Sequence, residues 1–467
     1  MTQRGDRAYF FSHKNHFSSI SILIAISLFF VLMTPVKAQE HDSAAVQQEL
    51  ETLKQRVAAL EKLLKLPRVA AAIANIAEEG NDSHTDTQVL ASVASDGSEQ
   101  QDKREATIGE TTLTFGGQLR MDVVVNDPSG SSNFGMSASS IPSSTVQGED
   151  WHTAMTLRDS RLWFKSTTPT KYGDFNTLIE TDFWGSSGNE TLSNSHNIRL
   201  RHAFAEFAGF TIGQTNSTFM HSGTAPDLII IPVTDVFVRQ PLLRYTQEFG
   251  DNEWQVALEQ PEATFSDSTA TQITPDDDRL PDLTGQVTWR PEWGQFSISG
   301  VLRHLHIDTG DTALGAVPAG VSDQAFGGGI FASSRIDLQG ANNIRLGYII
   351  GNGLGRYIAN NSFNAATVDN AGKIHLQNSM AAFAAYQHWW SDNWHSSFAM
   401  THAQVDNDLG ILSDTAFKDI QSYHANLRWA PLENATMGFE YGHARSEKEN
   451  GEKGRLHRFQ FSTIYNF

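Results

Sequence analysis

The chain ends with the segment Arg458-Phe-Gln-Phe-Ser-Thr-Ile-Tyr-Asn-Phe467. In an extended strand, successive side chains point to opposite faces of the sheet. One face of this segment therefore carries Phe459, Phe461, Thr463, Tyr465 and Phe467, and the other carries Arg458, Gln460, Ser462, Ile464 and Asn466. Strands with one apolar and one polar face are typical of β-barrels that cross an outer membrane, where the apolar face contacts lipid.

The same period of two recurs between Thr107 and Phe467. Apolar residues alternate with polar or small residues over 343–350, 423–429 and 436–441. Short turns containing Pro, Gly, Asn or Asp, the residues that tight turns require, fall at 169–173, 208–209, 250–253, 291–294, 339–342, 391–393 and 431–434. Longer connections fall near 127–150, 185–197, 216–240, 261–281, 307–322, 353–377, 406–418 and 445–454.

Short and long connections alternate strictly along this region. Seven short turns and eight long loops make fifteen connections, so we predict an all-β fold, a transmembrane barrel of sixteen antiparallel strands over residues 107–467. Short turns on one side and long loops on the other are typical of outer-membrane barrels, and sixteen strands leave room for an aqueous channel. A soluble β-sandwich or propeller is the alternative, but it does not explain apolar outward faces beside polar inward ones.

The composition excludes several other classes of protein. The 467 residues include 53 acidic and 34 basic residues, no cysteine, and have a mean hydropathy of −0.34. This polarity is too high for a helical membrane protein, and the absence of cysteine excludes disulfides, thiolate metal sites and cysteine nucleophiles. The net charge of −19 argues against general binding of nucleic acid, which favours basic surfaces.

The N-terminus predicts export from the cytoplasm. Arg4, Arg7 and Lys14 precede an apolar run over 20–33, and small residues follow up to Ala38. This order is typical of a cleavable signal peptide, here residues 1–38, whereas a membrane anchor needs a longer apolar run. Cleavage would remove four basic residues and one acidic residue, which lowers the net charge from −19 to −22.

A short heptad pattern follows the predicted signal peptide. Leu50, Leu53, Val57, Leu60 and Leu64 recur at alternating spacings of three and four, which predicts a coiled-coil helix within residues 39–66, on the periplasmic side. The alternative is an amphipathic helix that packs on its own domain. Pro67 ends this helix, and residues 67–106 are polar enough to predict a flexible linker before the barrel.

Charged residues on the polar faces of the strands are candidates for lining the channel. Arg161 and Lys165 share a face with Trp163, because Leu162 and Phe164 occupy the other face. The pore candidates for selectivity are Arg161, Lys165, Glu180, Asp182, Arg199, Arg201, Arg239, Arg244 and Arg345, and further basic candidates are Arg303, Arg335, Arg428 and Arg458. Arginines on one arc facing carboxylates on another create a transverse field that selects solutes. The alternative is that these charges only pair with each other inside a wet lumen.

The third long loop differs from the others in composition. Between Gln214 and Gln240 it contains the apolar run Leu228–Ile231, flanked by Pro226 and Pro232. Because exposed apolar runs are costly, we expect this loop to fold into the barrel and narrow its bore. Asp227, Asp235 or Arg239 would then lie near the constriction. A contact with a neighbouring subunit would explain the same run.

Several stretches resemble the DcaP-like trimeric porins. These stretches are 158–165, 168–173, 179–183, 200–207, 213–219, 239–241 and 244–246. Together with the predicted coiled coil, the resemblance covers residues 45–467. It implies a homotrimer with a sixteen-stranded channel, a periplasmic coiled coil and uptake of small anions such as dicarboxylates. Arg161, Lys165, Arg201, Arg239 and Arg244 match basic positions of these stretches. Trp163 stands where the family tolerates a small residue, and we expect it to narrow the bore locally.

Two other functions remain as alternatives, a barrel hydrolase and a plugged barrel that acts as an adhesin or structural protein. The histidines are scattered, and neither Gly-x-Ser-x-Gly nor His-Glu-x-x-His occurs in the chain. The acidic cluster at 275–279 lacks the ligand spacing of a calcium loop. We therefore expect no catalytic residue, metal or cofactor. The expected partners are further copies of the chain, outer-membrane lipid, lipopolysaccharide and small anionic solutes, and no nucleic acid.

Overall fold

The computed structural model describes residues 105–128, 136–143, 151–186 and 193–467, which all belong to one compact unit of the chain. The predicted signal peptide, the coiled coil and all but the last two residues of the predicted linker lie outside the described residues. No helix in the described ranges is long and apolar enough to cross a membrane.

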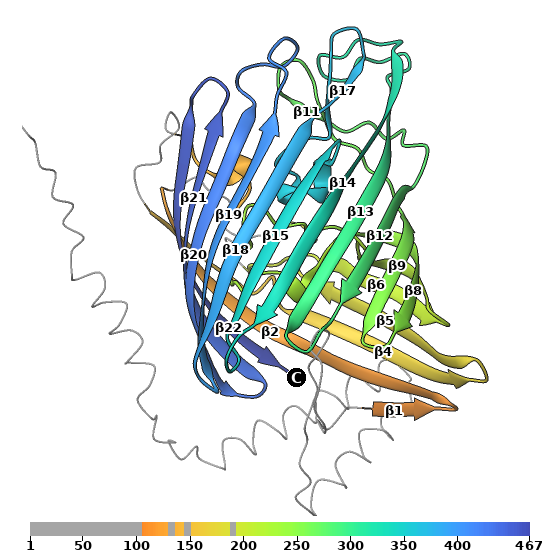
Figure 1. Cartoon of the computed structure of the whole chain (residues 1–467), viewed down its shortest axis with the longest axis vertical. Coiled ribbons are helices and arrows are strands. Elements are labelled where there is room, and N and C mark those ends of the chain that lie inside the picture. The colour runs from red at the N-terminus through yellow and green to blue at the C-terminus, as the bar shows by residue number, and fades with distance from the viewer. Residues whose placement is uncertain (1–104, 129–135, 144–150, 187–192) are drawn as a thin grey trace, which may run out of the picture. The chain divides into compact units, whose positions relative to one another are not determined.

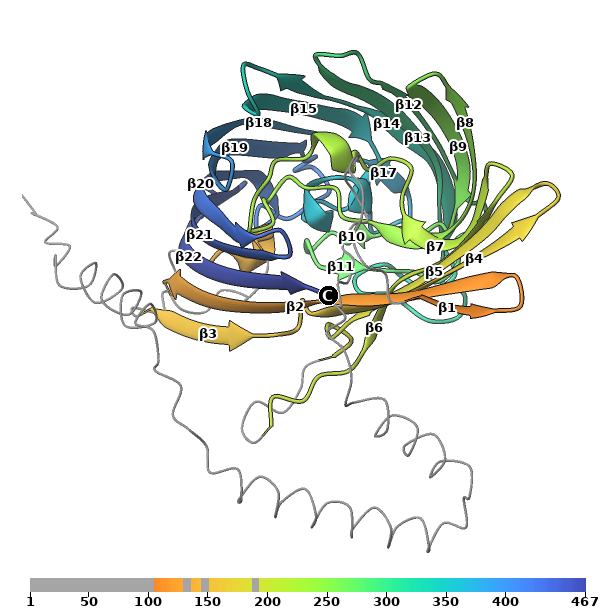
Figure 2. The same ribbon diagram turned by 90° about the horizontal axis from the view of Figure 1, so that it is seen from below.

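Within these ranges the chain forms a closed antiparallel barrel of sixteen strands, as predicted (Figures 1 and 2). The first strand is β2 (Thr111–Asp127), and β1 (Glu105–Ile108) forms a hairpin with its beginning. β3 (His152–Thr156) and β4 (Arg161–Thr170) pair with successive parts of β2 and together form the second barrel strand. The others are β5 (Gly173–Asp182), β6 (Arg199–Phe207), β7 (Phe210–Asn216), β8 (Arg239–Phe249), β9 (Asn252–Glu259), β12 (Asp282–Trp289), β13 (Gly294–Asp308), β14 (Ser322–Asp337), β15 (Asn343–Asn352), β18 (Asn378–Ser391), β19 (Trp394–Asp406), β20 (Phe417–Leu432), β21 (Ala435–Lys448) and β22 (Lys453–Asn466).

The barrel closes between its first and last strands. Gln118 in β2 lies opposite Asn466 in β22, and the ladder continues to the pair Asp127 and His457. Closure leaves no unpaired strand edge in the membrane, where water could not satisfy the backbone groups. The C-terminal segment 458–467 thus belongs to the strand that seals the barrel.

Short turns and long connections alternate as predicted, with one exception. The segment 445–454 was expected to be a long loop, but β21 ends at Lys448 and β22 begins at Lys453. Gly451, with a φ of 84°, completes this four-residue turn. The expectation was wrong because β21 and β22 remain paired through this segment. The paired residues there are charged, and charged residues are also typical of exposed loops.

Side chains alternate between the two faces of the wall. In β13, Ile298 and Leu302 are 59% and 64% exposed on the outer face, whereas the side chains of Ser297, Ser299 and Arg303 are buried on the inner face. A polar inner face next to an apolar outer face places the lipid outside and the water inside.

Loops fill part of the interior (Figure 2). Loop L1 (residues 128–151) contains η2 (Ala138–Ser140), L3 (residues 217–238) contains η3 (Ser222–Thr224), and L6 (residues 353–377) contains η4 (Gly355–Tyr357) and η5 (Ala359–Asn361). Phe219 and Ile230 of L3, Met136 of L1 and Tyr357 of L6 share one hydrophobic cluster with inward residues of the wall. The main core therefore lies inside the barrel.

A second, smaller sheet lies at the loop end. β10 (Phe265–Ser266) and β11 (Gln272–Ile273) come from loop L4 (residues 260–281), and β16 (Ala366–Val368) and β17 (Ile374–Leu376) come from L6. Their order is β11-β10-β16-β17. Phe265, Val368 and Leu305 belong to a separate hydrophobic cluster beneath this sheet. L4 packs on L6 through this sheet and so fixes the position of L6. L6 in turn lines part of the lumen.

Candidate functional site in the barrel lumen

L3 crosses the lumen and is held on the opposite wall by Asp227. The carboxylate accepts hydrogen bonds from Nε2 of Gln387 at 2.7 Å and Nε2 of His395 at 2.9 Å, and it forms an ion pair with Arg428. Burial alone would raise the pKa of Asp227, but the bond to His395 and the charge of Arg428 outweigh it and lower the pKa to about 2. L3 is therefore held by a charged anchor over the ordinary pH range.

Glu440 of β21 makes a second anchor for the same loop. Its fully buried carboxylate accepts hydrogen bonds from the backbone N–H groups of Ile229 at 2.5 Å and Ile230 at 3.3 Å. It is also 2.9 Å from Nδ1 of His424 and accepts a bond from Nδ2 of Asn426 at 3.1 Å. A buried carboxylate is costly unless it is fully hydrogen-bonded, and these partners satisfy it. The apolar run of L3 therefore folds inward, as its composition predicts.

L6 is fixed to the wall beside β8, β12 and β13. The buried Arg303 forms an ion pair with Asp282 at 3.3 Å and donates to the backbone oxygens of Gly353 and Leu354, both at 3.0 Å. The hydroxyl of Tyr357 donates to Asp282 at 2.9 Å. Arg303, which the sequence marked as a possible pore residue, is thus a structural anchor for L6.

L3 and L6 meet in the middle of the lumen. Asn360 donates its backbone N–H to the carbonyl oxygen of Asp235 at 2.9 Å, and its side chain donates to the carbonyl oxygen of Pro232 at 3.0 Å. From L1, the N–H of Ala138 donates to the hydroxyl of Ser362 at 3.1 Å. Three loops far apart in the sequence therefore support each other inside the barrel.

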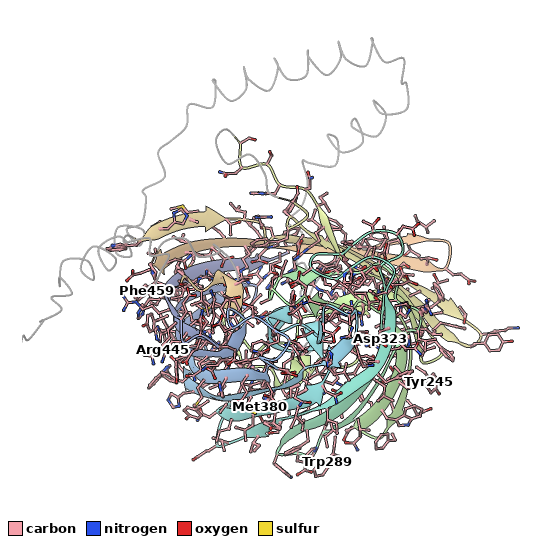
Figure 3. All side chains as sticks on the ribbon, turned by 90° about the horizontal axis from the view of Figure 1, so that it is seen from above. Tyr245, Trp289, Asp323, Met380, Arg445 and Phe459 are labelled. Atoms are coloured by element: carbon pink, nitrogen blue, oxygen red, sulfur yellow. The ribbon has the colours of Figure 1, made fainter. Side chains whose placement is uncertain are left out.

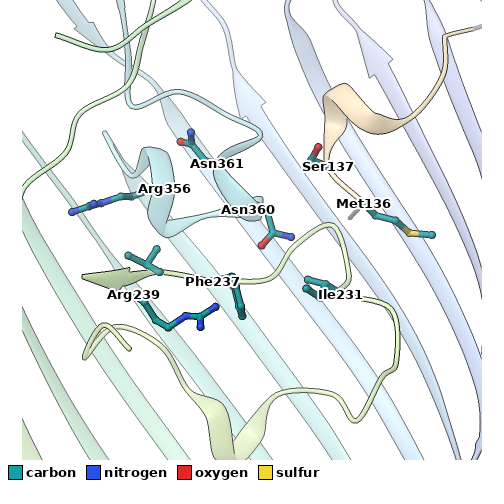
Figure 4. Close-up of a pocket in the computed structure, with 9 residues that line it drawn as sticks. Met136, Ser137, Ile231, Phe237, Arg239, Arg356, Asn360 and Asn361 are labelled. Carbon is teal, nitrogen blue, oxygen red and sulfur yellow. The ribbon is translucent and has the colours of Figure 1, made fainter. Parts of the chain in front are cut away.

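A cavity of about 430 Å³ lies where these loops meet (Figure 4). It is lined by Met136, Ser137, Ile231, Phe237, Val238, Arg239, Arg356, Asn360 and Asn361. None of these lining residues has a carboxylate. Arg239 at the start of β8 and Arg356 in η4 approach the cavity from different segments, and the two asparagines add amide groups. The charged part of the lining is thus entirely basic.

The two arginines differ in how their charge is compensated. Arg356 is 3.5 Å from a carboxylate oxygen of Asp282, which Arg303 already neutralises. Arg239 lies 4.5 Å from the ring centroid of Phe237 and has no ion pair within the part of the chain that the structure describes. Its Nη1 atom is buried without a hydrogen-bond partner there. Arg239 is therefore a positive charge in the cavity lining that no carboxylate of the described residues pairs with.

Further arginines lie on the wall beside Arg239. Asp182 is 2.6 Å from Arg199 and 3.0 Å from Arg201, and Glu180 is 2.5 Å from Arg201 and 3.9 Å from Arg161. The charge of Arg239 interacts with this group. Three arginines share two carboxylates, so the group keeps a positive charge and adds to that of Arg239.

Comparison with known families defines the family of this barrel. The family model for the DcaP outer membrane protein matches residues 42–467. The chain belongs to the DcaP outer membrane protein family. The crystal structure of the outer membrane channel DcaP of Acinetobacter baumannii is similar at a TM-score of 0.66 and 20% identity, covering 77% of this chain and 99% of that chain. No curated protein sequence matches.

Two other solved outer-membrane proteins are similar at lower TM-scores. OmpT of Vibrio cholerae has a TM-score of 0.48 and 10% identity, covering 78% of this chain and all of that chain. The anion-selective porin from Comamonas acidovorans has a TM-score of 0.47 and 9% identity, covering 77% of this chain and all of that chain. The family match makes this DcaP-family chain an outer-membrane protein.

The remaining pore candidates of this DcaP-family barrel lie elsewhere on the lumen wall. Lys165 lies 4.9 Å from the ring centroid of Trp163, whose ring lies against the backbone of Gly116 and so covers the wall. The expected local narrowing by Trp163 stays a prediction. Arg244 donates to the carbonyl oxygen of Asn216 at 3.5 Å.

Arg345 contacts L3, and its role in the pore stays a prediction. It donates to the carbonyl oxygen of Ala225 and to Oδ1 of Asn343 at 2.9 Å, so it supports L3. Arg356, Asn360 and Asn361 were not identified from the sequence. The long connection 353–377 was recognised, but an arginine and two asparagines in a polar loop give no signal that they turn inward.

Asp235 gives the DcaP-family lumen a titratable group near neutral pH. Burial raises its pKa to about 7, so its carboxyl is neutral below pH 7 and ionised above it. The folded protein keeps a proton that an exposed carboxyl releases near pH 4, so this residue lowers stability as the pH rises from about 4 to 7. Ionisation also places a negative charge at the contact between L3 and L6.

We therefore predict that anion preference falls as the pH rises through 7, and that Asp235→Asn removes this dependence. The asparagine resembles the protonated acid in shape and carries no charge at any pH. Reversal potentials in a salt gradient at pH 6 and pH 8 measure the effect. Asp174→Asn, at an exposed position in β5, is the control and should behave as wild type. A pH response that persists in Asp235→Asn would contradict this role.

Proposed function

We propose that this porin is a passive diffusion channel for small hydrophilic anions of the dicarboxylate type. The observation that carries the proposal is the cavity of about 430 Å³, whose charged lining residues are Arg239 and Arg356. This size accommodates a small organic anion with some water. Arginine suits such a solute because its planar guanidinium binds a carboxylate through two parallel hydrogen bonds.

The position of the two arginines supports selection at the narrow part of the channel. They lie where L3 and L6 restrict the lumen, so a passing solute comes close to both charges. The group formed by Arg161, Arg199 and Arg201 with its two carboxylates extends the positive potential along the wall. A solute with two carboxylates can bind the next arginine with one carboxylate while the other leaves the previous arginine. It therefore never binds tightly to one position, and conduction requires such weak binding at several sites.

Recording from the purified protein in a planar lipid bilayer tests the proposal. We expect ion conductance and a reversal potential in a salt gradient that is directed by the anion. A dicarboxylate added to one side should reduce the chloride current, because both compete for the same arginines. A cation-directed reversal potential would refute the anion preference. Absence of conductance would favour the plugged barrel that acts as an adhesin, or the hydrolase.

We also propose that the functional unit is a homotrimer, anchored in lipid and lipopolysaccharide and held together on the periplasmic side by the heptad segment. Its apolar positions, Leu50, Leu53, Val57, Leu60 and Leu64, form a seam suited to another helix. The seam is short, so it strengthens an assembly that the barrels themselves also maintain.

Deleting residues 45–66 should weaken the trimer and leave the pore conducting. The expected result is dissociation of the oligomer at a lower temperature, measured by native electrophoresis after heating, with unchanged single-channel conductance. Replacing Glu51 and Lys62, which lie on the side of the helix away from the apolar seam, by glutamine provides a control that retains the seam. Equal dissociation temperatures for the deletion and the wild type would count against the clamp.

A further inference from the structure

The outer face of β21 and β22 changes character near the loop end of the barrel. Tyr441 lies opposite Phe459, with ring centroids 5.0 Å apart, and Phe439 packs on Phe459 at 6.1 Å. Next along the same face, His443 lies opposite His457, and Arg445 lies opposite Arg455. Both arginines are exposed. An aromatic band thus gives way to a basic patch, defined here as His443, Arg445, Arg455 and His457.

The charges of this patch are not compensated by nearby carboxylates. Arg445 donates from Nε to Nε2 of His443 at 3.0 Å, and neither arginine forms an ion pair within the described part of the chain. Glu447, the next acidic residue on the face, is 3.0 Å from Lys418 and 3.2 Å from Lys453. Like charges directly opposite each other on a sheet are unfavourable. The arrangement suits an anion that bridges the two guanidinium groups.

Two further carboxylates flank the basic patch. Asp127 lies opposite His457, on the strand that follows β22 around the barrel. On the other side, Gln421 of β20 lies opposite Arg445, and Asp419 is two residues from Gln421 on the same strand. The carboxylate of Asp419 pairs with Nε2 of His402. Each therefore lies beside one edge of the patch, and the centre between Arg445 and Arg455 remains basic.

The height of the patch places it in the headgroup region of the membrane. Arg455 is four residues beyond Phe459, which is about 13 Å along a strand and roughly 10 Å in height for a tilted strand. The polar layer of a bilayer begins at the aromatic band and is about 5 to 8 Å thick, so His443 and His457 lie within it and the two arginines lie at its outer edge. Figure 3 shows Arg445 and Phe459 on the same outer flank of the barrel, away from the lumen. The patch therefore faces lipid headgroups and not the permeating solute.

We propose that this patch binds a phosphate group of lipopolysaccharide in the outer leaflet. The patch lies at the loop end, which in outer-membrane barrels faces the exterior. Arg445 and Arg455 would bind the phosphate through paired hydrogen bonds, and the acyl chains of the same molecule would pack on Phe439, Tyr441 and Phe459. The proposal rests on the location in the outer membrane and is independent of the solute that the channel passes.

A binding titration of the full-length protein in detergent with lipopolysaccharide tests this site. Each arginine near an anionic membrane surface contributes about a fivefold change in affinity, so Arg445→Gln combined with Arg455→Gln should bind roughly 25-fold more weakly. The lysine pair, Arg445→Lys with Arg455→Lys, keeps the charge and should lose less. Arg290→Gln, which removes an exposed arginine near a turn, is the matched control and should bind as wild type.

Two other ligands distinguish a lipid site from a simple phosphate site. Dephosphorylated lipopolysaccharide should bind the wild type as weakly as intact lipopolysaccharide binds the glutamine pair, and inorganic phosphate should not displace intact lipopolysaccharide. Single-channel conductance should be the same in all variants, which shows that each is folded. Equal affinity of wild type and the glutamine pair for lipopolysaccharide would overturn the proposal. Displacement by inorganic phosphate alone would also overturn it, because the acyl chains would then contribute nothing.

Discussion

Replacing Arg239 and Arg356 together by glutamine should abolish most of the anion preference that we propose for the channel. These are the charged residues that line the cavity. One unit charge at roughly 6 Å from an ion, with an effective dielectric constant of about 40, contributes about 1.4 kcal/mol. Each substitution should therefore lower the ratio of anion to cation permeability about tenfold, which a reversal potential in a salt gradient measures.

The structure suggests that both substitutions leave the fold intact. Arg239 has no ion pair in the described ranges, and loss of Arg356 leaves Asp282 bound to Arg303 and Tyr357. Arg239→Lys should keep the charge and most of the selectivity while weakening competition by a dicarboxylate, because lysine has no planar fork. Arg290→Gln, far from the cavity lining, should have no effect. An unchanged permeability ratio in the double variant would place selectivity elsewhere in the lumen.

The second large effect concerns the anchor of L3. Asp227→Ala removes the partner of Arg428, His395 and Gln387 in one step. Breaking a mostly buried ion pair while leaving its other member in place costs about 3 kcal/mol. Because L3 crosses the lumen, we expect a larger and noisier single-channel conductance, with a small change in the temperature of unfolding.

A double-mutant cycle separates the anchor from general damage to the protein. With Arg428→Gln, the Asp227→Ala substitution should cost less than it does in the wild type, because the unpaired cation is absent. Asp174→Asn, at an exposed position in β5, is the control and should conduct as wild type. Unchanged conductance in Asp227→Ala would mean that Glu440, Arg345 and the contacts with L6 hold L3 without Asp227.

The pH dependence of the same anchor has a defined sign. The pKa of Asp227 is lowered to about 2, so its contribution to stability is fully present above the ordinary value near 4 and is lost only as the pH falls through 2. Mild acid should therefore not reproduce the conductance of Asp227→Ala. We expect a transition near pH 7 from Asp235, because burial raises its pKa to about 7.

Much of the fold followed from local pattern. The alternation around Phe459 and Tyr441 and the turn residues at 208–209 and 431–434 predicted sixteen strands correctly, because each depends on neighbours in the sequence. The apolar run of L3 likewise indicated an inward fold. The prediction of a long loop at 445–454 was wrong, because charge near a strand end does not distinguish an exposed ladder from a loop.

The residues that line the cavity were harder to predict from the sequence than the strands. Arg239 was among the candidates, and it lines the cavity. Arg303 and Arg345 were equally plausible from their alternation, but they hold L6 and L3 instead. Arg356 lies in L6, and the polar composition of that loop does not indicate that the side chain lines the cavity.

The sequence by itself determined that the chain forms an outer-membrane barrel and that its third loop is apolar, because strand period and turn chemistry are properties of adjacent residues. The tertiary structure decided which charges neutralise each other and which remain available in the lumen. Asp227 and Arg428 are 201 positions apart and meet only because the barrel curves around L3. Such pairings depend on closure of the whole sheet, and no local pattern specifies them.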